Sequence, residues 1–84
     1  KTLSASTELD LRGLMSDEAF VELDKFIDDA ALAKIETVRV IHGKGTGALR
    51  SMVQQYCRQE KRIKSSRPGA YGEGEAGVTV ITLK

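Results

Sequence analysis

The hydrophobic period of this chain changes several times along its length, and these changes restrict the fold more than any other feature. Strand-like alternation and helical spacing follow one another over residues 9–11, 16–31, 37–41, 48–62, 63–67 and 78–83. The predicted order is therefore β-α-β-α-β-β. Because β-α-β crossovers are right-handed, we expect a two-layer α/β fold with both helices on one face of a four-stranded mixed sheet. The other sheet face is expected to stay partly open.

Both predicted helices are amphipathic. The first is expected to begin at Ser16, whose hydroxyl can cap free amides, and the second to end near Arg62. The apolar positions predicted to face the core are Phe20, Leu23, Ile27, Ala30 and Ala31 in the first helix, and Leu49, Met52, Val53, Tyr56 and Cys57 in the second. Cys57 is therefore expected to be a core residue.

The length of 84 residues fits one small domain. Residues 1–7 lack periodicity and are predicted to be a linker, and residues 8–84 the domain. The sequence begins with Lys1 and not with methionine, which suggests a piece of a longer protein. It has no long apolar run and no secretory pattern, so we expect a cytoplasmic protein with no membrane partner. One cysteine and one histidine are too few for a disulfide or an ordinary zinc site.

Charge is distributed unevenly along the chain. Residues 1–36 carry four basic and nine acidic side chains, whereas residues 37–72 carry eight basic and one acidic. The basic positions toward the end of this segment are Arg58, Lys61, Arg62, Lys64 and Arg67. Such a distribution favours binding to a polyanion such as a nucleic-acid backbone. The alternative is that the acidic and basic halves attract each other.

Two loops are expected to meet at one edge of the sheet. In α/β sheets, binding sites lie beyond the carboxyl ends of the parallel strands, here Arg12-Gly13 and residues 42–47. The glycines of His42-Gly43-Lys44-Gly45-Thr46-Gly47 let the backbone approach an anion, and the next helix begins there. The spacing excludes a P-loop and fits a dinucleotide-binding loop only loosely. A tight turn without a ligand is the other interpretation.

Three polar side chains are candidates for chemistry at this edge. Asp10 and Arg12 are two residues apart in a strand, so both side chains are expected on one sheet face, where they can form an ion pair. His42 can act as a general acid or base near neutral pH, or it can simply cap the strand through hydrogen bonds.

Three segments of the chain resemble the motifs of the Smr (small MutS-related) domain family. They are Leu9-Asp10-Leu11-Arg12-Gly13, His42-Gly43-Lys44-Gly45-Thr46-Gly47-Ala48-Leu49-Arg50, and Gly72-Glu73-Gly74 with Gly77-Val78-Thr79-Val80. The likeness is strongest to the version that ends the second class of bacterial MutS-like proteins. It implies a two-layer fold, nucleic-acid binding and nicking endonuclease activity on DNA, with roles in DNA repair and recombination. It also implies a longer parent with an ATPase that dimerises, although this fragment alone is expected to be monomeric.

The resemblance also assigns roles to residues. Many family members carry Asp-x-His in the first motif, whereas this chain has Asp10 and Arg12, and an arginine cannot act as a base. Asp10 or His42 is expected to activate the nucleophile, while Arg12 and Lys44 stabilise the phosphate. The predicted contacts to the backbone are Gly43, Gly45, Thr46, Gly47, Arg50, Arg58, Lys61, Arg62, Lys64 and Arg67.

Neither a metal-ligand set nor a cofactor motif is evident in the sequence, and Mg²⁺ or Mn²⁺ are the candidate cofactors. The alternative function is a module that grips RNA or a ribosome without cleaving it, as part of a factor that rescues stalled ribosomes.

Overall fold

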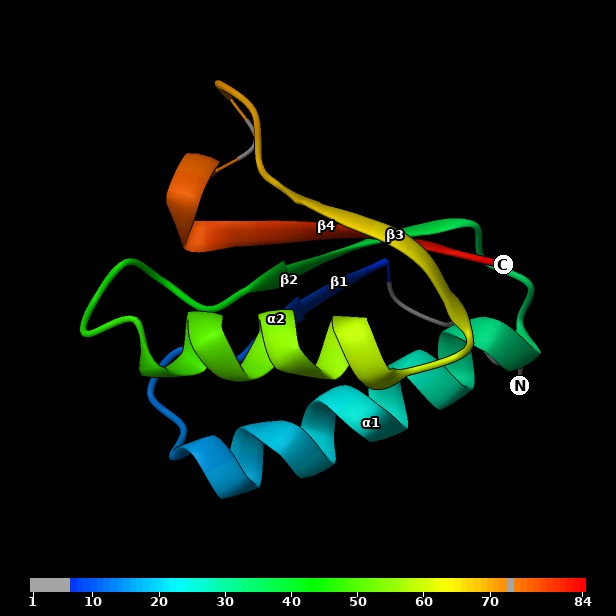
Figure 1. Cartoon of the computed structure of the whole chain (residues 1–84), viewed down its shortest axis with the longest axis horizontal. Coiled ribbons are helices and arrows are strands. Elements are labelled where there is room, and N and C mark those ends of the chain that lie inside the picture. Colours follow the sequence, from blue (N-terminus) through cyan, green and yellow to red (C-terminus); the bar gives the residue numbers. More distant parts are fainter. Residues whose placement is uncertain (1–6, 73) are drawn as a thin grey trace, which may run out of the picture.

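Two helices lie on one face of a four-stranded sheet in the computed structural model, which describes residues 7–72 and 74–84 (Figure 1). The elements are β1 (Glu8–Asp10), α1 (Ser16–Leu32), β2 (Thr37–Ile41), α2 (Ala48–Gln59), β3 (Ile63–Pro68), the short 3-10 helix η1 (Glu75–Gly77) and β4 (Val78–Leu83). This order and the mixed sheet confirm the predicted two-layer fold. The predicted linker lies almost entirely outside the described residues.

Strand direction decides which loops meet. The sheet order is β1-β2-β4-β3, with β1 parallel to β2, and with β4 antiparallel to both β2 and β3. Strands β1, β2 and β3 therefore run the same way, and only β4 runs against them. The segments that follow these three strands all leave the sheet at one edge, which is on the left in Figure 1. Two of them were expected to meet there, and the third was not.

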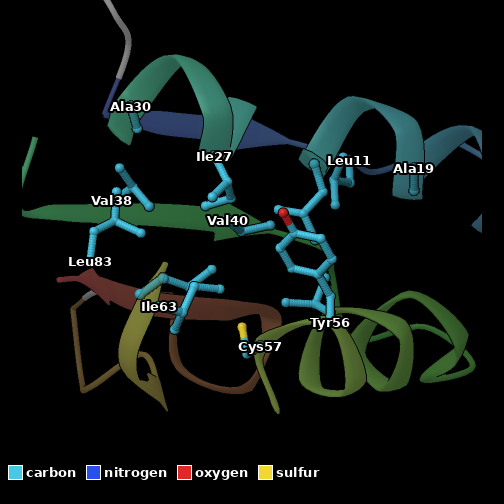
Figure 2. Packing of buried hydrophobic residues seen from close by; sticks show 13 residues of the cluster. Leu11, Ala19, Ile27, Ala30, Val38, Val40, Tyr56, Cys57, Ile63 and Leu83 are labelled. Atoms are coloured by element: carbon cyan, nitrogen blue, oxygen red, sulfur yellow. The ribbon is translucent and has the colours of Figure 1, made fainter. Parts of the chain in front are cut away.

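The core lies between the sheet and the two helices. Val38 and Val40 of β2 share a sheet face with Ile81, and all three are at most 1% exposed. Figure 2 shows these β2 side chains pointing at Ile27, with Tyr56 of α2 closing one end of the cluster. Cys57 is buried in the same cluster, as expected, and its burial raises the pKa of the thiol.

The opposite sheet face is partly open, as expected, but its central strand is covered. Arg39 of β2 and Arg67 of β3 flank Val80 of the central strand, and Val80 is only 5% exposed. Long arginine side chains can cover an apolar neighbour with their methylene groups while the charged end stays in water. The result is a face whose centre is apolar and buried, and on which Arg39 is paired with Glu8 of β1.

Helix α1 begins at Ser16, as predicted, but its capping residue and the end of α2 differ from the prediction. Met15, not Ser16, caps α1, and its backbone N–H donates to the Glu18 carboxylate at 3.1 Å, so the cap comes from the acidic first turn. Helix α2 ends at Gln59, because Glu60 already has an extended backbone.

One residue of the predicted core face is also placed differently. Phe20 is 48% exposed and meets the Tyr56 ring edge-on, at 5.7 Å between ring centroids, while Ala19 is fully buried. Leu23, Ile27 and Ala30 are buried as predicted, so the core face of α1 differs only at its start, where Ala19 takes the place predicted for Phe20. No helix among the described residues has the length and apolar character needed to cross a membrane.

Candidate functional site

A groove of about 360 Å³ lies where the loop after β1 meets the loop after β2. Its lining comes from residues 12–16 on one side and from 42–50, without Lys44, on the other. The two loops are fastened together at their bases, because the Leu11 N–H donates to the Ile41 carbonyl at 2.7 Å. This arrangement confirms that the first and central motifs are neighbours.

The beginning of α2 opens into this groove. Gly47 precedes the helix with φ of 87°, a left-handed conformation that strains other residues, and it offers no side chain to cap the helix. The Thr46 hydroxyl accepts only a long hydrogen bond of 3.3 Å from the Ala48 amide. The first turn of α2 contains no acidic residue, so its amides and dipole favour an anion.

Asp10 and Arg12 form a two-pronged ion pair beside the groove. The Asp10 carboxylate accepts from Nε of Arg12 at 3.0 Å, from its Nη2 at 2.8 Å and from its backbone N–H at 3.0 Å. These hydrogen bonds lower the pKa of Asp10 to about 2. The Arg12 side chain is 62% exposed and thus able to turn toward a ligand. At rest, Asp10 is therefore an ionised but weakly basic carboxylate.

The pKa of Asp10 gives a direct test of this pair. Carbon-detected NMR should place the carboxyl midpoint near 2 in the native chain, and Arg12→Ala should move it up toward the ordinary value of about 4. Because the folded-state pKa is lowered, the stabilisation by the pair is complete above pH about 4 and disappears as the pH falls toward 2. An unchanged midpoint in Arg12→Ala would show that Arg12 does not hold the carboxylate.

His42 does not join this pair in a polar cluster. Its side chain is 5% exposed at the floor of the groove, and its Nε2 lies 2.8 Å from Oγ1 of buried Thr79. Nδ1 lies 3.0 Å from the Gly43 carbonyl, which can only accept, so Nδ1 donates to it and Nε2 is the ring nitrogen paired with the Thr79 hydroxyl. Asp10 faces the other side of the sheet. Both ring nitrogens thus hold the glycine loop in place, as a hydrogen-bonding strand cap would.

Thr79 was not expected to take part in the site. In the sequence it is one of two threonines in a strand of alternating residues, and nothing marks it as different from Thr82. The pairing of β2 with β4 places Thr79 beside Val40 on the helix-covered face. His42 lies two residues after Val40, so its side chain is on the same face and reaches Thr79. A polar residue among apolar ones is a signal that both threonines share, so the sequence does not single out Thr79.

Two further cations lie close to the groove. Arg50, in the first turn of α2, lines it directly and also shares a hollow of about 110 Å³ with Arg67, at the end of β3. Lys44 does not line the groove, because its side chain lies over Gly77, 3.4 Å from where a Cβ on that glycine would be. Arg12, Arg50 and Arg67 thus form one cationic rim at this edge, with Lys44 beside it.

The other predicted phosphate contacts lie elsewhere. Arg58 and Lys61 are near the end of α2, more than two helical turns from Arg50, and Lys64 lines a hollow with Lys34 and the chain end. They do not extend the cationic rim, because α2 and the start of β3 carry them to the far end of the molecule.

Arg62 is the clearest departure from the predicted set of phosphate contacts. Its guanidinium binds Asp24 at 3.3 Å, Asp28 at 3.0 Å and Glu60 at 2.9 Å. The Tyr56 hydroxyl also donates to Asp24, and burial together with this hydrogen bond raises the pKa of Tyr56. Attraction between the acidic and basic halves of the chain therefore explains the position of the Arg62 side chain. Its charge is already neutralised by carboxylates.

The residues at this edge do not form a preassembled metal site. No group of three or more acidic, histidine or cysteine side chains among residues 7–72 and 74–84 could hold an ion. Asp10, the carboxylate beside the groove, is already bound by Arg12. Glu73 of the third motif lies outside the described residues. The donor set of the described residues therefore does not fit a resident Mg²⁺ or Mn²⁺.

Fold and site together define a small two-layer α/β domain with a groove at one edge of its sheet, lined by Arg12, Arg50 and the start of α2. The chain belongs to the Smr domain family, whose sequence profile matches residues 9–84. Along all 84 residues it is 55% identical to Endonuclease MutS2 of Geobacillus thermodenitrificans and 50% identical to Endonuclease MutS2 of Acetivibrio thermocellus. In both cases it spans 11% of the relative's length.

Solved structures agree with this assignment. The Smr domain of Thermus thermophilus MutS2 superposes with a TM-score of 0.91 at 43% identity, over 94% of this chain and 99% of that one. YdaL, a stand-alone small MutS-related protein of Escherichia coli, gives 0.88 at 21% identity, over 93% and 64%. This second likeness shows the fold alone.

Proposed function

We propose that this domain binds a nucleic-acid backbone in the groove and hydrolyses a phosphodiester bond there, as a nicking endonuclease that acts on DNA. The observation that carries the proposal is the groove itself, where Arg12, Arg50 and the first-turn amides of α2 surround space for a phosphate. Two relatives that match the full length of this chain are named endonucleases, which supports the same activity here.

The ion pair suggests how hydrolysis would begin. A phosphate oxygen competes with Asp10 for the Arg12 guanidinium, and both side chains are exposed enough to separate. Once Arg12 has turned, Asp10 loses the partner that lowers its pKa and becomes a stronger base.

The bonds then change in one displacement. Asp10 takes a proton from water as the water oxygen attacks phosphorus, and the bond from phosphorus to the departing sugar oxygen breaks, with that oxygen protonated by solvent. Arg12 and the helix amides stabilise the pentavalent phosphate. His42 positions the glycine loop and does not exchange a proton with the substrate.

Salt-dependent binding tests where the backbone lies. The affinity of the 84-residue chain for a fluorescent DNA duplex should fall with salt, and Arg12→Gln and Arg50→Gln should each reduce the slope of log K against log salt by about 1. Arg58→Gln is the matched control and should leave both slope and affinity nearly unchanged. Loss of affinity in Arg58→Gln with none in Arg50→Gln would place the nucleic acid at the other end of the molecule.

A further inference from the structure

Tyr71 is almost entirely exposed, although it is one of only four aromatic residues in the chain. It lies in the loop between β3 and η1, and 95% of its surface is accessible. Large aromatic side chains are usually covered at least in part, because each one exposes a large apolar area. The ring of Tyr71 is therefore open on the surface and accessible to a partner.

The described residues on either side of Tyr71 contact β4 and η1. The Gly69 N–H donates both to the Glu75 carbonyl and to the Val78 carbonyl, at 3.1 and 2.9 Å, which closes the loop at its base. Gly74 has φ of 100°, and a Cβ there would lie 2.3 Å from a Val78 methyl carbon. Gly69 and Gly74, on either side of Tyr71, thus lie against β4 and η1, while Tyr71 itself is exposed.

The same loop is fastened to the groove. The Gly77 carbonyl accepts from the backbone N–H groups of His42 and Gly43, each at 3.0 Å. Arg67, which ends β3 just before the loop, shares a hollow with Arg50 of the groove wall. Figure 1 shows this orange segment leaving the sheet at the same edge as the green loop after β2. The cationic rim thus continues from the groove to the base of the tyrosine loop.

The chemistry of the loop selects one part of a nucleic acid. Glu75, which lies in η1 close to Tyr71 in sequence, is exposed and would repel a phosphate. The face of a base is uncharged, and stacking on an aromatic ring tolerates every base sequence. Paired bases inside a duplex do not offer this face, so the base that meets Tyr71 has to be unpaired.

We infer that Tyr71 is a stacking platform for an unpaired base of the nucleic acid whose backbone lies in the groove. This inference rests on the proposed function and names the feature of the substrate that the domain would recognise. Arg67 and Arg50 would follow the backbone between the two contacts.

Two DNA probes separate this inference from the proposed function. One is a fully paired duplex, and the other is the same duplex with a short unpaired tail that contains 2-aminopurine, whose fluorescence falls on stacking. We expect the 84-residue chain to quench the 2-aminopurine fluorescence of the tail. Tyr71→Leu should abolish the quenching and weaken binding of the tailed probe by roughly 5- to 150-fold, with unchanged binding of the duplex. Tyr71→Phe, which keeps an aromatic ring, should behave like the native chain.

Binding of the tailed probe by Tyr71→Leu with native affinity and native quenching would overturn the stacking role and leave the proposed function standing. Binding of neither probe by the native chain would overturn both. The side chain is exposed, so Tyr71→Leu should stay folded, and circular dichroism checks this.

Discussion

Asp10→Asn is expected to slow strand cleavage by about 10²- to 10⁴-fold, because the amide cannot accept a proton from the attacking water. The substitution also removes a negative charge beside the groove, so DNA binding should be kept or slightly strengthened. Cleavage is measured on supercoiled plasmid under single-turnover conditions, and binding by anisotropy. Slower cleavage with unchanged or tighter DNA binding would exclude weaker binding as the cause of the lost activity.

Glu8→Gln is the matched control for this substitution. Glu8 is also in β1, faces the same side of the sheet and forms its own ion pair with Arg39. It lies two residues before Asp10 in the strand and is farther from the groove. Its loss should change cleavage little. Equal losses in both variants would mean that overall charge on this strand matters and that Asp10 has no specific role.

His42→Ala is expected to lower the free energy of unfolding by roughly 3–5 kcal/mol, since it leaves a cavity and an unpartnered Thr79 hydroxyl in the interior. Such a loss is a large part of the stability of a domain of this size. Urea titration followed by circular dichroism measures it. A catalytic histidine would instead leave stability nearly unchanged and remove activity alone.

Thr79→Val should also lower the free energy of unfolding, by about 1–3 kcal/mol, because it leaves one ring nitrogen of His42 without its partner. Thr82→Val on the same strand is the control. Thr82 is partly exposed and faces the other side of the sheet, so its effect should stay within about 0.5 kcal/mol. A native-like Thr79→Val would show that His42 does not depend on this hydroxyl.

Periodicity predicts the elements of this fold well but places their details less well. The alternation of spacing predicts all four strands and both helices, since each long element buries one face. It does not distinguish Ala19 from Phe20 at the start of α1, because both positions lie at the border of the apolar stripe. The ring of Phe20 reaches Tyr56 from that border, and such a contact depends on how the two helices pack.

The site illustrates the same limit. Strand topology predicts that the loops after β1 and β2 meet, and the spacing of Asp10 and Arg12 predicts their ion pair. The direction of the His42 side chain depends on its pairing with Thr79, which the sequence does not reveal. Whether the charge of Arg62 is free to bind a phosphate depends on carboxylates of α1 more than thirty residues away. Long-range pairing, not local pattern, decides which charges remain available.

The position of the bound backbone is the central claim, and an amide NMR titration with a short DNA duplex tests it most directly. The largest shifts are expected at residues 12–16 and 43–50, above all at the amides of Leu49 and Arg50, with residues 58–64 little affected. Shifts concentrated at residues 58–64 and around Lys34, with the groove unchanged, would contradict it.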